Sequence, residues 1–365
     1  MQETESIPGY GEQERELTTD VSKCPSCGAN LVFSPEEQAL KCNHCDTVLS
    51  FQKARTEEQD FSKLLETQNA WSDETTVYVC NNCGAKEIVP RESIARHCPF
   101  CGTTNVVETQ ELSGLKPNAV VPFRITKENA VERFKAWVKK KIFAPREFKR
   151  SARPETVDGA YNPAFTYDAN TFTFYQGRLG RYKTVTTRVN GKTTTRRVLE
   201  YFNIHGTYSS FFDDVLIQAS GAVPQKTLDK LQPFDTNNAQ EYSQNYMHGF
   251  TANQYTKDGI KCWEEARGAI GRMIKEAVLR KYTYDVVVNF DARTEYSDVK
   301  FKYVLLPLYV GHCTWHKKLY NFFVNGFNGK IHGKTPLSPL RVILAAALGA
   351  AVLGGIIAVV VLFVL

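Results

Sequence analysis

Four cysteines near the N-terminus have the residue type and spacing of metal ligands. Cys24 and Cys27 form one Cys-x-x-Cys pair, and Cys42 and Cys45 form a second pair after fourteen intervening residues. By residue type alone, such a set could be a metal site, a redox centre or two disulfides. The spacing is close to that of a structural zinc site, in which each pair directs two thiolates at one ion. A redox centre would need only one pair, next to a βαβ pattern that this sequence lacks.

The same unit occurs a second time downstream. Its cysteines are Cys80, Cys83, Cys98 and Cys101, and fourteen residues again separate the two pairs. A repeat of this kind indicates two copies of one small fold. We therefore predict two tandem zinc ribbons, each holding one structural Zn²⁺ through four thiolates. Because thiolates would fill all four positions, neither ion would have an open site for catalysis, and chelation should unfold the ribbons.

Cysteine usage and the N-terminal residues indicate the compartment. Eight of the ten cysteines have metal-type spacing, which suits a reducing compartment better than a secreted one. Residues 1–20 are acidic and contain no apolar segment of the kind that a signal peptide has. We predict that they form a disordered acidic tail.

The C-terminal end is uncharged and apolar over residues 342–365. As a helix these residues would extend about 36 Å, which exceeds a hydrocarbon core of about 30 Å. We predict a single transmembrane anchor over residues 341–365. The charged residues that flank the span all lie upstream of it, as Lys317, Lys318, Lys330, Lys334 and Arg341. Because positive flanks stay on the cytoplasmic side, we expect the body of the protein in the cytoplasm.

The remaining residues divide into a linker and a larger domain. We assign ribbon 1 to residues 21–50, a helical linker to 51–76, ribbon 2 to 77–108 and the larger domain to 109–335. A first helix should begin with Thr126 as its N-cap and place on one face Val131, Phe134, Val138 and Ile142. A second amphipathic helix, residues 257–281, has an apolar side made of Trp263, Ala266, Ile270, Met273, Ile274 and Ala277.

Most of the rest of the larger domain has the pattern of strands. Examples are residues 170–177, 182–208, 284–294 and 301–315. The sequence VNGK at 189–192 predicts a hairpin, because Asn-Gly suits a type I′ turn, and a related turn recurs within 320–334. The predicted fold class is α+β, with a mainly antiparallel β-rich domain, two or more helices and a C-terminal transmembrane helix.

The order of these parts resembles a known group of proteins. Its features are the paired four-cysteine units, the strand VLLPLYV and the stretch FVNGFNGKIHGKTPLS before the apolar end. They resemble bacterial membrane-associated proteins with transcription-factor-IIB-type zinc ribbons, often called primosomal-helicase-like although they lack helicase motifs. The resemblance is most distinctive over residues 24–101 and 323–339. Some members are similar to partners of SPFH-type scaffolds or of phage-shock-type proteins, which implies a role in membrane stress.

The sequence favours a non-enzymatic adaptor that holds partner proteins at the cytoplasmic face of the membrane. Nucleic-acid binding is the alternative, because the predicted hairpin carries seven basic residues without an acid among them: Arg178, Arg181, Lys183, Arg188, Lys192, Arg196 and Arg197. Charged hairpins also block edge pairing, and basic surfaces near a membrane also attract anionic lipid. The hairpin alone therefore does not favour nucleic acid over these other contacts.

No enzyme motif was found in the sequence. It contains no phosphate-binding Gly-x-x-x-x-Gly-Lys-Ser/Thr loop, no Gly-x-Ser-x-Gly elbow and no His-Glu-x-x-His motif. One cluster, His312, Cys313 and His316, contains reactive residue types. Strand alternation would place the two histidines on one face and the cysteine on the other, so we interpret them as strand residues. We interpret Cys262 as a packing residue of the second helix.

The predicted anchor also carries two rows of small residues. They recur every fourth position, as Ala346, Ala350 and Gly354 and as Ala347, Ala351 and Gly355. Such rows let two helix backbones approach closely, so the anchor has a face for self-association or for pairing with a partner's membrane helix.

Overall fold

The computed structural model describes most of the 365-residue chain. The described residues are 23–65, 75–82, 85–90, 97–100, 103–104, 106–109, 115–152, 154, 156–189 and 192–364. The predicted acidic tail, residues 1–20, lies outside them. The described residues form an α+β fold with a large, mainly antiparallel sheet and five α-helices, which confirms the predicted fold class at this level.

The first cysteine unit forms a small sheet of its own. Its strands are β1 (Leu31–Ser34), β2 (Ala39–Cys42) and β3 (Val48–Leu49), in the order β1-β2-β3. Phe33 of β1 is buried, as is Phe51 just after β3, and both rings contact Tyr246, at centroid distances of 5.2 and 5.0 Å. The unit is therefore packed on the larger domain by its own aromatic side chains.

The second cysteine unit belongs to the large sheet. Its strands are β5 (Thr75–Cys80), β6 (Lys86–Pro90) and β7 (Val106–Thr109). Strand β6 pairs with β12 (Thr251–Asn253), and β12 pairs with the central strand of the larger domain. The order in the large sheet is β11 (Gln240–Glu241), β8 (Ala119–Val120), β13 (Val286–Trp315), β9 (Thr156–Val189), β12, β6, β5 and β7. The predicted boundary between residues 77–108 and the larger domain is therefore crossed by backbone hydrogen bonds.

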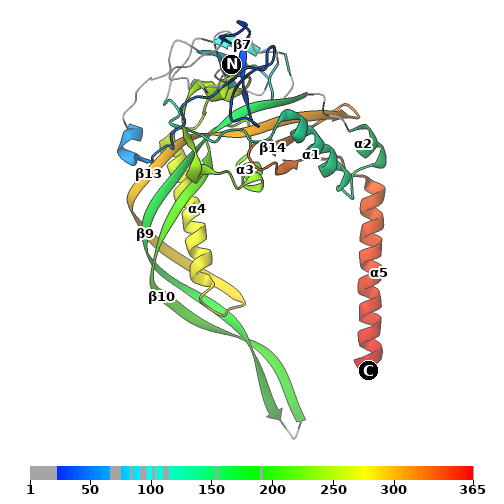
Figure 1. Cartoon of the computed structure of the whole chain (residues 1–365). Helices are drawn as coiled ribbons and strands as arrows, with labels where there is room; N and C mark the ends of the chain where they lie inside the picture. Colours follow the sequence, from blue (N-terminus) through cyan, green and yellow to red (C-terminus); the bar gives the residue numbers. More distant parts are fainter. Residues whose placement is uncertain are drawn as a thin grey trace, which may run out of the picture.

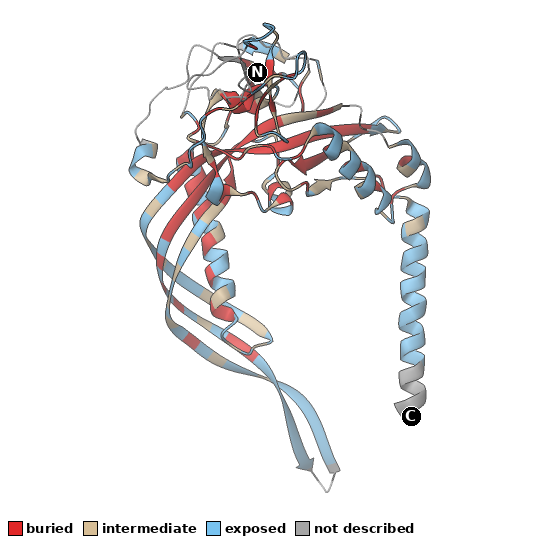
Figure 2. Ribbon diagram, in the orientation of Figure 1, coloured by how far each residue is buried: buried red, intermediate tan, exposed pale blue. Residues whose placement is uncertain are grey.

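Three very long strands dominate the large sheet: β9 (Thr156–Val189), β10 (Lys192–Gln218) and β13 (Val286–Trp315). They curve away from the body as an arm (Figure 1). Val189 and Lys192 are direct partners, which confirms the predicted two-residue hairpin connection. The pairing of β13 with β9 begins at Gly180, so residues 181–189 and 192–200 form a two-stranded, mostly exposed tip (Figure 2).

The two predicted helices are present. Helix α1 (Lys127–Lys139) has Thr126 as its N-cap, whose side chain accepts a hydrogen bond from the Asn129 N–H. Ile142 is 70% exposed, contrary to expectation, because the helix ends before it. Two shorter helices are α2 (Arg146–Ser151) and α3 (Gln225–Leu231).

Helix α4 (Gly259–Leu279) lies along the concave side of the arm (Figure 1). Four of the six residues predicted for its apolar face are buried, and the ring of Trp263 packs 5.3 Å from that of Tyr167 on β9. Met273 was expected on this face but is 39% exposed, because it lies at the edge of the buried stripe.

Residues 51–76 were predicted to be a helical linker, and over the described residues they contain no α-helix. They hold β4 (Gln59–Asp60) and a short 3-10 helix η1 (Phe61–Leu65), and β4 pairs with β13. The part of the predicted linker at residues 59–60 is thus joined to the arm by backbone pairing, and residues 66–74 lie outside the described residues.

Short elements complete the large sheet and its connections. The strands are β8 (Ala119–Val120), β11 (Gln240–Glu241), β14 (Lys318–Asn325) and β15 (Ile331–Gly333). Two 3-10 helices, η2 (Thr236–Asn238) and η3 (Gln244–Met247), flank β11. Strands β14 and β15 pair across the second predicted turn.

Helix α5 (Pro339–Val364) extends away from the body (Figures 1 and 2). Its Pro339–Ala358 segment has a mean hydropathy of 2.2 and none of its residues is buried, so it is long and apolar enough to cross a membrane. Its first turn is tied to the segment after α1, because Arg341 Nη1 donates to the Ile142 and Ala144 carbonyls at 2.8 and 2.7 Å.

Candidate metal centre

The first four predicted ligands converge in the structure. The Sγ atoms of Cys24, Cys27, Cys42 and Cys45 all lie within 4.8 Å of one another. Cys24 Sγ lies 3.5 Å from Cys45 Sγ, and Cys27 Sγ lies 3.5 Å from Cys42 Sγ. One cysteine of each pair is buried and the other is exposed. This arrangement could hold a metal ion between the two turns.

The turns that carry these cysteines share one backbone geometry. The Cys24 N–H donates to the Ala29 carbonyl at 2.8 Å, and the Cys42 N–H donates to the Thr47 carbonyl at 2.9 Å. Gly28 has a φ of +76°, and Asp46 at the matching position has a φ of +57°. The left-handed conformation favours glycine and is tolerated by aspartate, which explains the residue types that follow each pair.

The same hydrogen bond recurs in the second unit. The Cys80 N–H donates to the Ala85 carbonyl at 2.9 Å, and the Cys98 N–H donates to the Thr103 carbonyl at 2.7 Å. In all four turns the first cysteine therefore bonds the residue five positions later. Cys83 and Cys101 lie outside the described residues, so the convergence of the second set of thiols stays a prediction.

The electrostatics of the first set favour a bound cation. Burial opposes ionisation of Cys24, but the Ser26 and Cys27 N–H groups lower its pKa to about 6. The Thr47 side chain, 3.1 Å from Cys45 Sγ, lowers the pKa of Cys45. A backbone N–H lowers the pKa of Cys27, but neighbouring thiols and burial raise it to about 12. Because adjacent thiolates repel one another, a cation is required for all four to ionise together.

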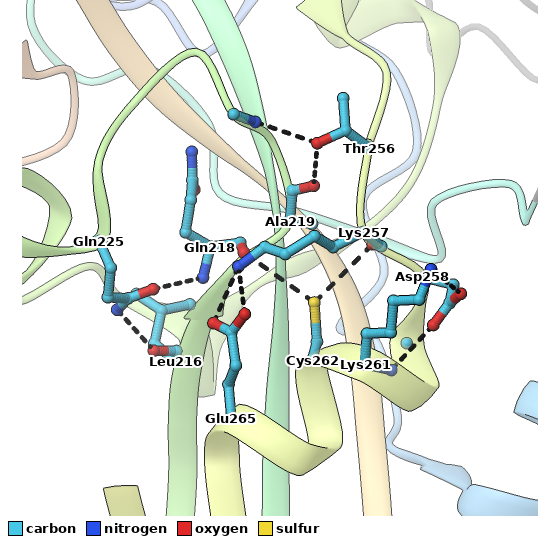
Figure 3. A network of polar contacts seen from close by, with 12 residues as sticks. Leu216, Gln218, Ala219, Gln225, Thr256, Lys257, Asp258, Lys261, Cys262 and Glu265 are labelled. Carbon is cyan, nitrogen blue, oxygen red and sulfur yellow. Dashed lines mark hydrogen bonds and ion pairs between the residues drawn. The ribbon is translucent and has the colours of Figure 1, made fainter. Parts of the chain in front are cut away.

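Cys262 is buried and is not a member of this set, and Figure 3 shows its thiol between Gln218 and Lys257. Its Sγ lies 3.9 Å from the Gln218 carbonyl oxygen and 3.8 Å from the Lys257 carbonyl oxygen. Burial raises its pKa to about 12, so the thiol stays protonated at neutral pH. This agrees with its interpretation as a packing residue of the second predicted helix.

The His312, Cys313 and His316 cluster does not form one site. His312 is buried and its Nδ1 lies 3.2 Å from Thr156 Oγ1, whereas Cys313 Sγ is 3.8 Å from the Tyr320 carbonyl oxygen. His316 was expected to be a strand residue, but it lies outside the strands. It has a φ of +48° in the tight turn between β13 and β14, where its ring stacks on Trp315. Sequence reasoning missed this turn because His-Lys lacks the usual Asn-Gly signal.

A second group of possible ligands was also missed from sequence. Carboxylate oxygens of Glu58, Asp168 and Asp213 lie within 4.8 Å of one another. The nearby Lys302 side chain is 5% exposed, and its Nζ lies 2.9 Å from Asp214 Oδ1 and 3.4 Å from Glu58 Oε1. This buried ammonium offsets part of the acidic charge. Glu58 directly precedes β4, which pairs with β13, whereas Asp168 lies on β9 and Asp213 in a bulge of β10, so spacing along the chain does not reveal the cluster.

The basic residues of the arm do not gather on one face. From the strand register, Arg178, Arg188 and Arg197 point to one side of the sheet, and Arg181, Lys183 and Arg196 point to the other. Two of the arginines on the first side cover tyrosine rings, Arg178 over Tyr201 at 4.9 Å and Arg197 over Tyr182 at 4.7 Å.

Comparison with known proteins gives one relative to report. The chain is 27% identical over 321 residues to the uncharacterized protein YdjG of Bacillus subtilis (strain 168), which covers 87% of this chain and 90% of that protein. No protein-family model matches the chain, and no solved structure matches it.

Proposed function

We propose that this protein is a non-enzymatic, membrane-anchored zinc-ribbon adaptor that holds partner proteins at the cytoplasmic face of the membrane. One observation carries the proposal: the first cysteine unit, drawn in blue at the top of Figure 1, lies far from the C-terminal end of α5. A membrane helix at one end and a protein-binding module at the other is the arrangement that a tether requires.

Zinc is the ion that the donor set fits. Four thiolates in two turns provide a soft, tetrahedral set, which Zn²⁺ prefers and which leaves no coordination site open. In the second unit, Cys80, Cys83, Cys98 and Cys101 are proposed to hold another ion in the same way. Both ions are structural in this proposal, and their role is to stabilise small folds with little apolar core.

Helix α5 is proposed to be the membrane anchor, with the rest of the chain in the cytoplasm. None of its residues from Pro339 to Ala358 is buried, which for apolar side chains is a costly state in water and a favourable one in lipid. The basic residues Lys330 and Lys334 precede the helix and Arg341 lies in its first turn, as expected for a flank that stays on the cytoplasmic side.

Nucleic-acid binding through the arm is the second candidate. The arginines over Tyr182 and Tyr201 favour it, since aromatic and guanidinium groups together can stack on bases. The division of the other basic residues between two faces disfavours it, because a phosphate backbone would meet only part of the charge. We therefore prefer the adaptor.

Deleting residues 342–365 tests the adaptor proposal. We expect the shortened protein to be soluble, to retain its zinc and to move any dedicated partner off the membrane with it. The matched control replaces residues 342–365 by an unrelated apolar helix, which should restore both proteins to the membrane. A partner that stays at the membrane in the absence of this protein would contradict a recruiting role.

A salt series on the full chain separates the second candidate. Binding to DNA, RNA and anionic vesicles would be measured at increasing salt concentration. Tight, sequence-dependent binding to DNA or RNA with a steep salt dependence would replace the adaptor by a nucleic-acid-binding function.

A further inference from the structure

The arm tip, residues 181–189 and 192–200, combines many cations with almost no acid. Its basic residues are Arg181, Lys183, Arg188, Lys192, Arg196 and Arg197, and its one acid is Glu200. No Asp or Glu occurs between Asp168 and Glu200. A few charges of either sign would block edge pairing of the strands, so that role does not explain charges of a single sign. The composition indicates an anionic partner.

The tip exposes these cations to solvent on both of its faces. Among residues 181–188 and 193–200, every side chain is exposed except that of Leu199, which is half-buried. The strand register divides the cations between the two faces. A partner that meets one face, such as the backbone of a nucleic acid, would leave the cations of the other face without an anion. A partner that surrounds the tip would meet all of them.

The other side chains of the tip have the chemistry of a membrane interface. The ring of Tyr182 is 46% exposed, and the Arg197 guanidinium covers it at 4.7 Å. Val185 and Val198, on the other face, are each 37% exposed. Tyrosine rings concentrate at the level of the lipid headgroups, and long basic side chains reach phosphates from there. The tip therefore fits the headgroup layer better than the hydrocarbon.

The direction of the arm brings its tip to the membrane. In Figure 1 the arm and α5 leave the body on the same side, and the tip reaches beyond the C-terminal end of α5 in this view. The arm is thus on the membrane side of the body when α5 is inserted. The tip cannot follow α5 through the hydrocarbon, because its two strands have open edges and its side chains are charged. It must lie at the surface of the bilayer.

An arm along the surface requires α5 to be inclined to it. Residues 334–338, which join β15 to α5, form neither helix nor strand, and no residue from Pro339 to Ala358 is buried. The first turn of α5 is held by hydrogen bonds from Arg341 to the segment after α1. A change in the inclination of α5 therefore breaks a few hydrogen bonds and no element of secondary structure.

We propose that the arm tip lies in the headgroup layer of the membrane that α5 crosses and binds anionic lipid through its cations. This inference rests on the membrane anchor proposed above and adds a second membrane contact to it. Anionic headgroups attract Lys and Arg side chains near the surface, and the headgroup layer is deep enough to meet both faces of two paired strands. Two contacts fix the orientation of the body above the membrane, which one helix alone does not.

Hydrogen exchange of the tip amides tests the proposal on the full-length, zinc-loaded protein. The protein would be placed in nanodiscs of phosphatidylcholine alone and in nanodiscs with an equal part of phosphatidylglycerol, and exchange within residues 181–200 would be followed by mass spectrometry. Two strands without further support are marginally stable in water, so lipid contact should slow exchange by at least about tenfold in the anionic nanodiscs. Equal exchange in the two kinds of nanodisc would overturn the proposal.

Two matched triple variants locate the contact. Arg188→Gln, Arg196→Gln and Arg197→Gln together should bring exchange in anionic nanodiscs to within about threefold of that in neutral ones. The control, Lys53→Gln, Lys226→Gln and Lys261→Gln together, removes the same charge from exposed positions outside the tip and should keep the full slowing. Each variant is compared with itself in the two lipids, so a change in the tip's own stability cancels.

Zinc content and melting temperature would verify that both triple variants fold. Slowing that survives the tip variant, or that disappears in the control, would contradict the assignment to the tip.

Nucleic acid is the competing partner of the tip. DNA and RNA oligonucleotides would be added to the protein in neutral nanodiscs, and the same amides would be followed. If an oligonucleotide slows their exchange and anionic lipid does not, the tip is a nucleic-acid surface and the proposal is wrong.

The anchor and the tip contact can fail separately. Retention on neutral nanodiscs reports on α5, whereas slowed exchange in anionic nanodiscs reports on the tip. If the protein stays on neutral nanodiscs and anionic lipid does not slow exchange, the anchor stands and the tip contact fails. If the protein binds anionic nanodiscs alone, with slowed exchange at the tip, the anchor fails and the tip contact stands.

Discussion

The two cysteines of each pair in the first unit differ in burial. Cys24 and Cys42 are buried and continue into the core of the molecule, whereas Cys27 and Cys45 are at the surface. Replacing a ligand by serine leaves three thiolates and removes the closed tetrahedral set. The effect on metal content should therefore be similar for all ligands, although the effect on packing differs.

Cys42→Ser and Cys98→Ser should each reduce the zinc content of the full chain from two ions to one. The measurement is metal analysis of gently purified protein, with Cys262→Ser as the control because that thiol is remote from the first ligand set. A wild-type content of one ion, or a native disulfide among these cysteines, would contradict the assignment.

The buried acid Asp168 makes stability depend on pH. Burial, then the neighbouring Glu58 and Asp214 carboxylates, raise its pKa from 3.8 to about 7, against a hydrogen bond from the Asp214 N–H. The folded protein thus binds this proton more tightly than the unfolded chain does. The stability that this bound proton contributes is fully present below about pH 4 and is lost as the pH rises through about 7.

Asp168→Asn removes this titration and keeps an acceptor for the Asp214 N–H. The melting temperature of the variant relative to the native protein should rise by a few degrees between about pH 5.5 and about pH 8. Asp213→Asn, an exposed member of the same cluster, is the control and should change this difference little. If the melting temperatures of Asp168→Asn and of the native protein change in parallel with pH, Asp168 is ionised over this whole pH range.

At the scale of elements, the arm and α5 differ in what surrounds them. The long strands of the arm bury one face against α4 and expose the other, whereas α5 is exposed on every described side. The small residues of α5 therefore remain available to another helix. In a membrane, close backbone contact along such a row stabilises helix pairs.

Substituting Ala350 and Gly354 together by leucine should weaken self-association of α5 in a membrane dimerisation assay. Leucine side chains would hold the two backbones apart. Val352→Leu, on another side of the helix, is the control and should leave the signal unchanged. An undiminished signal for the double variant would leave α5 as a plain tether.

At the scale of the whole molecule, the first cysteine unit and the larger domain share one core. The ring of Phe33 packs on that of Tyr246, and the Phe33 N–H donates to the His248 carbonyl at 2.8 Å. Gly249 approaches Val32 closely. A side chain at Gly249 would meet Val32 at 3.3 Å in a backbone conformation with a φ of +86°. Loss of the metal should therefore weaken the larger domain as well as the unit that holds it.

Phe33→Ala tests this coupling between the unit and the larger domain. The change should lower the free energy of unfolding by about 3–5 kcal/mol, because it leaves a cavity between them. Phe211→Ala removes a ring that is 56% exposed on the arm and should cost much less. The readout is the melting temperature together with zinc retention during dialysis against a chelator. Retained stability in Phe33→Ala would mean that the two parts unfold independently.

The sequence by itself determined the features that depend on local spacing. The paired cysteines predicted the first ligand set, and Asn-Gly predicted the hairpin of the arm. Thr126 predicted the start of α1, and the uncharged run predicted α5. Each depends on residues that are neighbours along the chain or within one turn of a helix, so the pattern alone is sufficient.

Only the tertiary structure decided which distant segments meet. It joined the second cysteine unit to the large sheet, paired residues 59–60 with the arm, and brought Glu87 of β6 beside Asn253 of β12. The sequence contains no signal for these contacts. Strands pair through backbone N–H and C=O groups, which nearly every residue has, so the types of the side chains say little about which strand will be the partner. That the arm leaves the body on the same side as α5 is likewise decided only by the fold (Figure 1).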